Sequence, residues 1–187
     1  MRIAEKPEAL ALLAQHTTQL LGAAGGCIMC ALASGRDPAL LVHQNAHGAV
    51  LLDRFGSRRG HLLVVAKRHL ESVSEFEWEE YAELQRLGFD ACRVLESALQ
   101  PKRVYVAVLG AATALATSYP HYHVHLVPIV EDDARARPAQ VFSWSAGVVI
   151  YEPQEAAALV AELGSAWPRA QERLPTQAQL PTASLPE

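Results

Sequence analysis

Residues 119–128 read YPHYHVHLVP, and three histidines occupy alternate positions in this otherwise apolar run. Successive side chains of a β-strand point to opposite faces of the sheet, so residues two apart share a face. The alternation predicts a strand with His121, His123 and His125 on one side and apolar residues on the other. Burying all three rings would require a polar partner for each, which disfavours a purely structural role. The row suits metal binding or nucleophilic and acid–base chemistry.

The rest of the chain predicts further strands and three helices. Strands are expected at residues 40–45, 49–55, 61–66, 103–110 and 121–130, and a strand broken at a glycine is expected over 141–151. Helices are expected from about residue 7, over 74–99 and over 152–167. Ser74 and Glu77 have the spacing of a capping box at the start of the long helix. Strands and helices without regular βαβ alternation indicate an α+β domain on an antiparallel sheet.

Composition suggests three parts and limits the partners. We expect an N-terminal helical extension over 1–24, a domain over 25–167, and a flexible tail over 168–187, which is rich in Pro, Gln, Ala and Ser. The net charge of −4, from 16 basic and 20 acidic residues, predicts no nucleic-acid partner. No apolar run is long enough to span a membrane, and the N-terminus reads as an amphipathic helix rather than a signal peptide. We therefore expect a cytoplasmic protein.

The three cysteines are an odd number, which argues against a disulfide framework. Cys27 and Cys30 form a Cys-x-x-Cys pair that needs two further ligands to hold a structural zinc ion. His43 and His47 complete the spacing of a nucleic-acid-binding zinc finger. That interpretation is disfavoured, because residues 40–45 alternate like a strand and basic residues for phosphate contacts are nearly absent.

Three segments together resemble the histidine-triad (HIT) family of nucleotide hydrolases and transferases, in its zinc-containing bacterial type. They are CIMC at 27–30, AVLLDRFGSRRGHLLVVAKRH at 49–69 and HYHVHLV at 121–127. The resemblance covers about residues 25–130. It implies a five-stranded antiparallel sheet with a long helix and flanking helices, and a homodimer.

The resemblance also implies residue roles. His123 would attack the α-phosphorus of a nucleotide to form a nucleotidyl-histidine, and His125 would bind phosphate and manage the leaving-group proton. Asp53 would hold the ribose hydroxyls, although it could instead cap the end of the hairpin. Leu63 would line the base pocket, and Ser118 would bond to the phosphate.

The zinc-containing relatives imply a structural Zn²⁺ site instead of a finger. Its ligands would be Cys27, Cys30, His69 and His121. The alternative is a metal-free pair of small reduced thiols. His61 is assigned to the sheet rather than to either site, and His16 has no assigned role.

The segment before the triad departs from the family pattern. Residues 108–121 contain neither the Asn nor the Gln that members commonly carry, and Thr117 occupies the Gln position. The leading hypothesis is a hydrolase or nucleotidyltransferase that acts on the α-phosphate of a nucleoside phosphate conjugate. Two alternatives remain: a zinc-stabilised nucleotide-binding protein with little or no catalysis, and a metal-dependent hydrolase that uses all three histidines at an open site.

Overall fold

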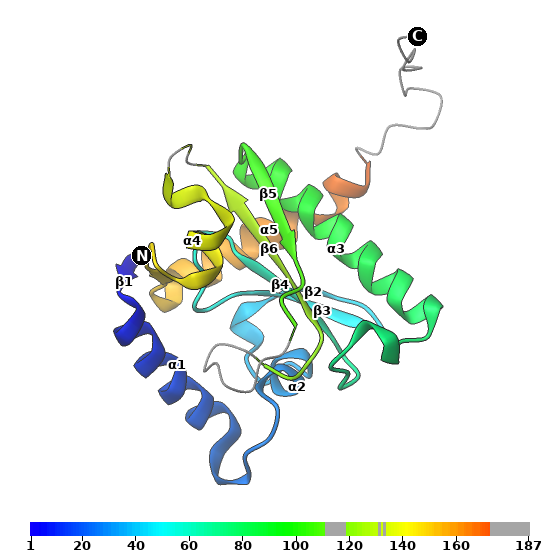
Figure 1. The fold of residues 1–187 in the computed structure, drawn as a ribbon. Helices are drawn as coiled ribbons and strands as arrows, with labels where there is room; N and C mark the ends of the chain where they lie inside the picture. The colour runs from blue at the N-terminus through cyan, green and yellow to red at the C-terminus, as the bar shows by residue number, and fades with distance from the viewer. Residues whose placement is uncertain (111–118, 131, 133, 173–187) are drawn as a thin grey trace.

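The computed structural model describes residues 1–110, 119–130, 132 and 134–172. Its centre is a five-stranded antiparallel sheet in the order β2-β3-β4-β6-β5 (Figure 1). The strands are β2 Leu41–Gln44, β3 Gly48–Leu52, β4 Leu62–Ala66, β5 Arg103–Ala107 and β6 His123–Ile129. Helices surround this sheet, so the expected α+β fold with a five-stranded antiparallel sheet is confirmed.

The long helix α3, Trp78–Leu99, packs across one face of the sheet and contacts four of its strands. Its buried face consists of Leu84, Leu87, Asp90, Ala91, Val94 and Leu95. The helix begins later than the expected residue 74, because Ser72 and Glu75 form the capping box of a preceding short 3₁₀ helix. Two overlapping Ser-x-x-Glu pairs were available in the sequence, and the structure uses the earlier one.

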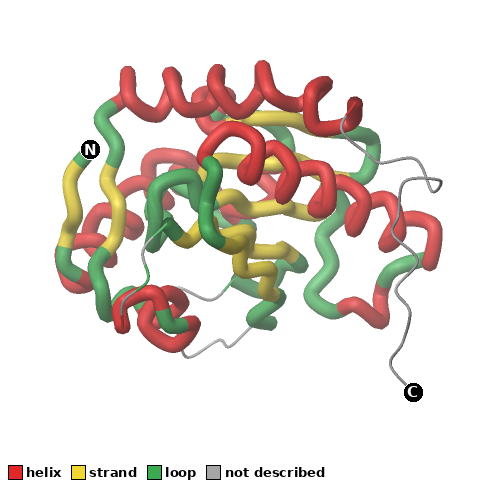
Figure 2. The backbone as a smooth tube through the Cα atoms, turned by 90° about the horizontal axis from the view of Figure 1, so that it is seen from above, coloured by secondary structure: helices red, strands yellow, loops and turns green. Residues whose placement is uncertain are grey.

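Figure 2 shows the helices arranged around the strands. The remaining elements are α1 Lys6–Leu21, α2 Ile28–Ala33, α4 Pro138–Ser143, α5 Pro153–Glu172, and the 3₁₀ helices η1 Gly22–Ala24, η2 Pro38–Leu40, η3 Val73–Glu75 and η4 Ala134–Ala136. Helix α5 packs beside α3 and β2, and α2 packs against β3 and β4. Helix α5 runs past residue 168, the expected start of the tail, and residues 173–187 lie outside the described part.

A second, two-stranded sheet pairs the first residues of the chain with the segment between α4 and α5. Strand β1, Arg2–Ala4, pairs antiparallel with β7, Val148–Ile150. The sequence did not predict β1, and the strand expected over 141–151 is shorter than expected. Residues 141–143 belong to α4, and Trp144 leaves that helix in the left-handed region at φ 62°. No helix in the described ranges has the length and apolarity needed to cross a membrane.

Candidate active site and metal cluster

A cavity lies over the face of the sheet that carries the histidines. Tyr122, Val124 and Leu126 point to the opposite side, where they join the core under α3, as the alternation predicts. The apolar walls of the cavity come from α1, α2, α4 and the sheet strands, and its polar lining is His16, Asp53, Arg54, His61, Tyr119, His123 and His125. The sequence reasoning found the sheet residues of this cavity but not the contributions of α1 and α4.

His123 stands at the start of β6, opposite Val65 of β4, and it is buried. Its Nδ1 lies 2.7 Å from the backbone oxygen of His121. Because a carbonyl only accepts, Nδ1 carries the proton in this network and donates it, so Nε2 keeps its lone pair. Burial lowers the pKa of His123, which favours the neutral ring. This is the protonation state that a nucleophilic imidazole needs.

His125 lies beside His61, a residue that sequence reasoning assigned to neither site. His61 Nε2 is 3.0 Å from His125 Nδ1, and the backbone N–H of Ser57 donates to His61 Nδ1 at 3.2 Å. In this network His61 therefore donates from Nε2 to His125, and the proton of His125 resides on its own Nε2. Burial, followed by His61 and His123, lowers the pKa of His125. The signal was present in the sequence, since His61 follows Gly60 within the resembling segment 49–69.

Asp53 follows β3 and lines the same cavity. Its Oδ1 accepts a hydrogen bond from the Phe55 backbone N–H at 2.9 Å, so the residue does cap the turn after the strand. Its Oδ2 lies 3.4 Å from His61 Nδ1. Leu63 pairs with His125 across β4 and β6 and also lines the cavity. Ser118, the expected phosphate contact, lies outside the described residues.

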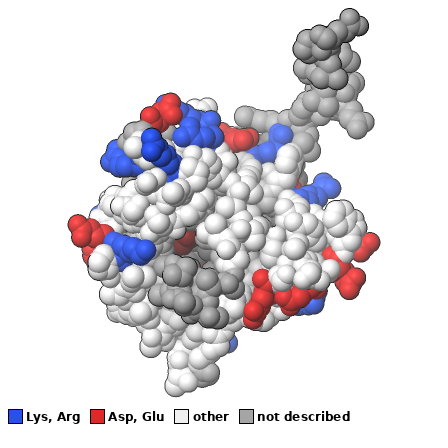
Figure 3. Space-filling view, viewed as in Figure 1, with Lys and Arg blue, Asp and Glu red and all other residues white. Residues whose placement is uncertain are grey.

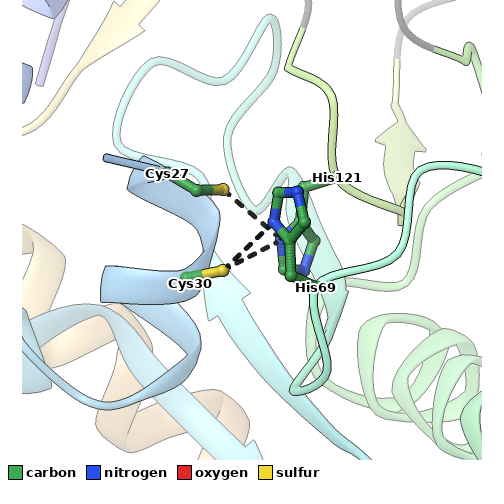
Figure 4. Close-up of side chains that lie close together, drawn as sticks. All are labelled: Cys27, Cys30, His69 and His121. Atoms are coloured by element: carbon green, nitrogen blue, oxygen red, sulfur yellow. Dashed lines mark hydrogen bonds between the residues drawn. The ribbon is translucent and has the colours of Figure 1, made fainter. Parts of the chain in front are cut away.

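The four expected metal ligands converge at the N-terminal end of α2 (Figure 4). Cys30 Sγ lies 3.3 Å from His69 Nδ1 and 3.4 Å from His121 Nδ1, and Cys27 Sγ lies 3.4 Å from His121 Nδ1. The two Nδ1 atoms are 3.3 Å apart. The bond lengths of tetrahedral zinc give ligand–ligand separations of about 3.3–3.8 Å. The donor set and its spacing therefore fit a closed zinc site.

The surroundings of His121 support the same conclusion. Its Nε2 lies 2.8 Å from the Ala66 carbonyl oxygen, which fixes the proton on Nε2 and directs the Nδ1 lone pair toward the thiols. Burial, followed by the neighbouring Cys27 thiol, raises the pKa of Cys30 to about 11. Bound zinc would reverse this effect, because it holds cysteine as the thiolate.

Two alternative metal sites lack this convergence. His43, a ligand of the possible zinc finger, stacks on Trp167 with ring centroids 4.1 Å apart and does not join the cysteines. A site using all three triad histidines is also absent among the described residues, because His121 groups with the cysteines while His125 groups with Asp53 and His61.

Comparisons with known proteins agree with this geometry. An uncharacterized 16.1 kDa HIT-like protein of Mycoplasma pneumoniae is 31% identical over 105 residues, covering 56% of this chain and 72% of its own. A zinc-bound histidine triad family protein from Mycobacterium smegmatis superimposes with a TM-score of 0.54 at 25% identity, over 75% of this chain and 97% of its own.

A more distant structure shares the fold. Plasmodium falciparum diadenosine triphosphate hydrolase superimposes with a TM-score of 0.56 at 13% identity, over 73% of this chain and 80% of its own. The sequence model described as the HIT domain matches residues 34–132, which include β2 to β6 and all three triad histidines. The chain therefore belongs to the HIT domain family.

Proposed function

We propose that this protein is a nucleotide hydrolase or nucleotidyltransferase that acts on the α-phosphate of a nucleoside phosphate conjugate. The observation that carries the proposal is the hydrogen bond from His123 Nδ1 to the His121 carbonyl oxygen. It leaves the Nε2 lone pair of His123 as the nucleophile in a cavity that also holds His125. The diadenosine triphosphate hydrolase named above shows that a protein of this fold acts on such a conjugate.

The reaction has two steps. His123 Nε2 forms a bond to the α-phosphorus as the bond to the leaving group breaks; His125 Nε2–H donates a hydrogen bond to the departing oxygen, which takes up a proton from solvent. Water or phosphate then attacks the nucleotidyl-histidine and loses its proton to solvent, and the nucleotide is released while His123 regains its lone pair. Asp53 would hold the ribose hydroxyls and Leu63 the base, with Ser118 on the phosphate.

The cysteine and histidine cluster is proposed as a structural zinc site. Cys27 and Cys30 belong to the start of α2, His69 to the segment after β4, and His121 to the segment that leads into β6. Zinc held by all four would tie these segments together and fix the chain directly before His123. His121 then has a structural role and does not take part in the chemistry.

A homodimer and a cytoplasmic location complete the proposal. Strand β5 is an edge of the sheet, and Val106, Val108 and Leu109 on and after it are about half exposed or more. The face seen in Figure 3 is uncharged over much of its centre. An unpaired apolar edge is suited to a second copy of the chain. The free cysteines Cys27, Cys30 and Cys92 fit the reducing cytoplasm.

The test is a screen of nucleoside phosphate conjugates for release of the nucleoside monophosphate. Suitable candidates are dinucleoside polyphosphates, phosphoramidates, adenylylated sulfate and sugar nucleotides. With an active substrate labelled in the nucleotide, rapid quenching should trap label on the wild-type protein but not on His123→Asn. Binding without turnover or trapped label would instead favour the zinc-stabilised binding protein, which the missing Asn and Gln before the triad also suggest.

The order of three substitutions tests the assignment along the strand. His123→Asn should reduce turnover by several orders of magnitude, because the covalent route is lost. His125→Asn should cost roughly 10²–10³-fold, as is typical of losing one hydrogen-bond donor to the developing charge. His121→Asn should lower the zinc content and the folding stability, because the His121 ring is assigned to the metal and not to the chemistry. If His121→Asn abolished turnover in a folded, zinc-loaded protein while His123→Asn stayed active, these roles would be wrong.

A further inference from the structure

Helix α1 forms part of the cavity although it lies outside the matched family segment, which begins at residue 34. Strand β1, directly before α1, pairs with β7, and this pairing anchors the start of the helix. Ala9 and Leu13 of α1 are buried in a small hydrophobic cluster with Phe55 and Val148. Leu13 and His16 therefore reach the cavity from a fixed position.

His16 is the only ionisable side chain that α1 contributes to the lining of this cavity among the described residues. The other α1 residue there, Leu13, is apolar, as are the α2 residues Ile28, Met29 and Leu32. The His16 ring lies 5.9 Å from the Phe55 ring, centroid to centroid. His16 therefore adds one polar ring to the side of the cavity formed by α1 and α2, which is otherwise apolar, and a few placed polar groups in an apolar wall orient a ligand.

The environment of His16 selects one tautomer. Its Nε2 is buried without a hydrogen-bond partner in the described structure, and it lies 3.8 Å from Asp37 Oδ2. A proton on Nε2 would face that carboxylate favourably, whereas a lone pair there would face a negative charge. Burial, followed by the nearby Arg54, lowers the pKa of His16, while Asp37 opposes that shift. The neutral ring with its proton on Nε2 keeps an acceptor lone pair on Nδ1.

We infer that His16 is a specificity-determining residue, whose Nδ1 accepts a hydrogen bond from an exocyclic amino group on the nucleobase of the substrate. This inference rests on the proposed function and adds the substrate class: nucleotides of adenine or cytosine over their keto counterparts. A carbonyl oxygen in place of the amino group would meet the Nδ1 lone pair, and neither atom could donate. A site left with such an unmatched polar contact discriminates strongly between ligands.

Two matched ligand pairs isolate this contact. Adenosine and inosine 5′-monophosphates differ in the base only by the amino or keto group at C6 and the associated proton at N1. Cytidine and uridine monophosphates differ in the same way at C4 and N3. Calorimetric titration of the wild-type protein should show roughly tenfold tighter binding of the amino member of each pair. His16→Phe should bring both ratios close to one.

Two further variants complete the design. Gln15→Ala changes an exposed neighbour on the same helix and should leave both ratios as in the wild type. Asp37→Asn removes the carboxylate that favours the proton on Nε2, and it should reduce both ratios. It also keeps the test decisive if His16→Phe does not fold.

The outcomes separate this inference from the proposed function. If none of the four monophosphates binds the wild-type protein, the proposed function fails and this assignment fails with it. If they bind but the wild type and His16→Phe share the same ratios, the assignment alone is overturned. A wild-type preference for the keto members would also overturn it.

Discussion

His61 Nε2 and His125 Nδ1 lie 3.0 Å apart, and both rings line the cavity that holds His123. The Ser57 backbone N–H occupies the other nitrogen of His61, so His61 can serve only as a donor toward His125. This hydrogen bond places the proton of His125 on Nε2, the nitrogen that would donate a hydrogen bond to the leaving group. His61 thus acts through His125 and is a positioning residue.

Replacing His61 with Leu should slow the turnover of substrates with poor leaving groups more than that of substrates with good ones. Without the donor, His125 loses its fixed tautomer and its hydrogen bond to the leaving group, and departure of a poor leaving group should slow by roughly 10–100-fold in kcat. A conjugate with a good leaving group, such as a p-nitrophenyl ester of the nucleotide, needs no protonation and should retain most of its kcat. Steady-state kinetics on both substrates measure the difference. Equal losses on the two would indicate general structural damage instead.

The same residue predicts how stability changes with pH. Burial lowers the pKa of His61 in the folded protein, and this outweighs the opposing effect of Asp53. Below about pH 6.5 the His61 ring binds a proton in the unfolded chain but stays neutral in the folded chain, so unfolding becomes easier as the pH falls. The stabilisation is complete above that pH and is lost below it, at up to ~1.4 kcal/mol per pH unit.

Urea unfolding of the wild type and His61→Asn between about pH 5 and 7.5 tests this slope. The variant should lose stability less steeply toward low pH, and any metal contribution is common to both proteins. Parallel curves would show that His61 does not resist protonation in the folded state.

Local patterns predicted the centre of the fold and much of the candidate site. The alternation around His123 and the apolar runs of β3 and β4 specify strands without long-range information. The register then pairs Leu63 with His125, so one cavity receives residues from both segments. The Cys-x-x-Cys pair was equally recognisable, although only the resemblance selected His69 and His121 over His43 and His47 as its partners.

The features that were missed depend on contacts between distant parts of the chain. Strand β1 has three residues and gains its structure from pairing with β7, which lies more than 140 residues away in the sequence. Residues 141–143 were expected to begin a strand but continue the helix that starts at Pro138, where proline suits the first turn. His16 looked like any polar residue on an amphipathic helix, because its neighbour Asp37 lies in another element.

Strand β5 should mediate dimerisation. Val106 is 60% exposed on this edge strand, and a charge there opposes edge-to-edge pairing. We expect light scattering to give a dimer mass for the wild type at micromolar concentration and a monomer mass for Val106→Glu. Val73→Glu is the matched control, since Val73 is also about half exposed but lies in η3. A monomeric wild type, or equal dissociation of both variants, would contradict this surface.

Zinc content and stability should depend on one cysteine and not on another. Cys30 lies within 3.4 Å of two imidazole nitrogens, whereas Cys92 lies in α3 outside the four-residue cluster. Protein never exposed to chelator should carry about one zinc per chain. Cys30→Ser should lose the metal and lower the melting temperature by roughly 10 °C or more, because metal binding contributes to folding. Cys92→Ser should keep the zinc and melt close to the wild type. Metal analysis and calorimetry measure zinc content and melting temperature. If the wild type carries no zinc, or if both substitutions destabilise the protein equally, the cluster is better described as a metal-free pair of thiols.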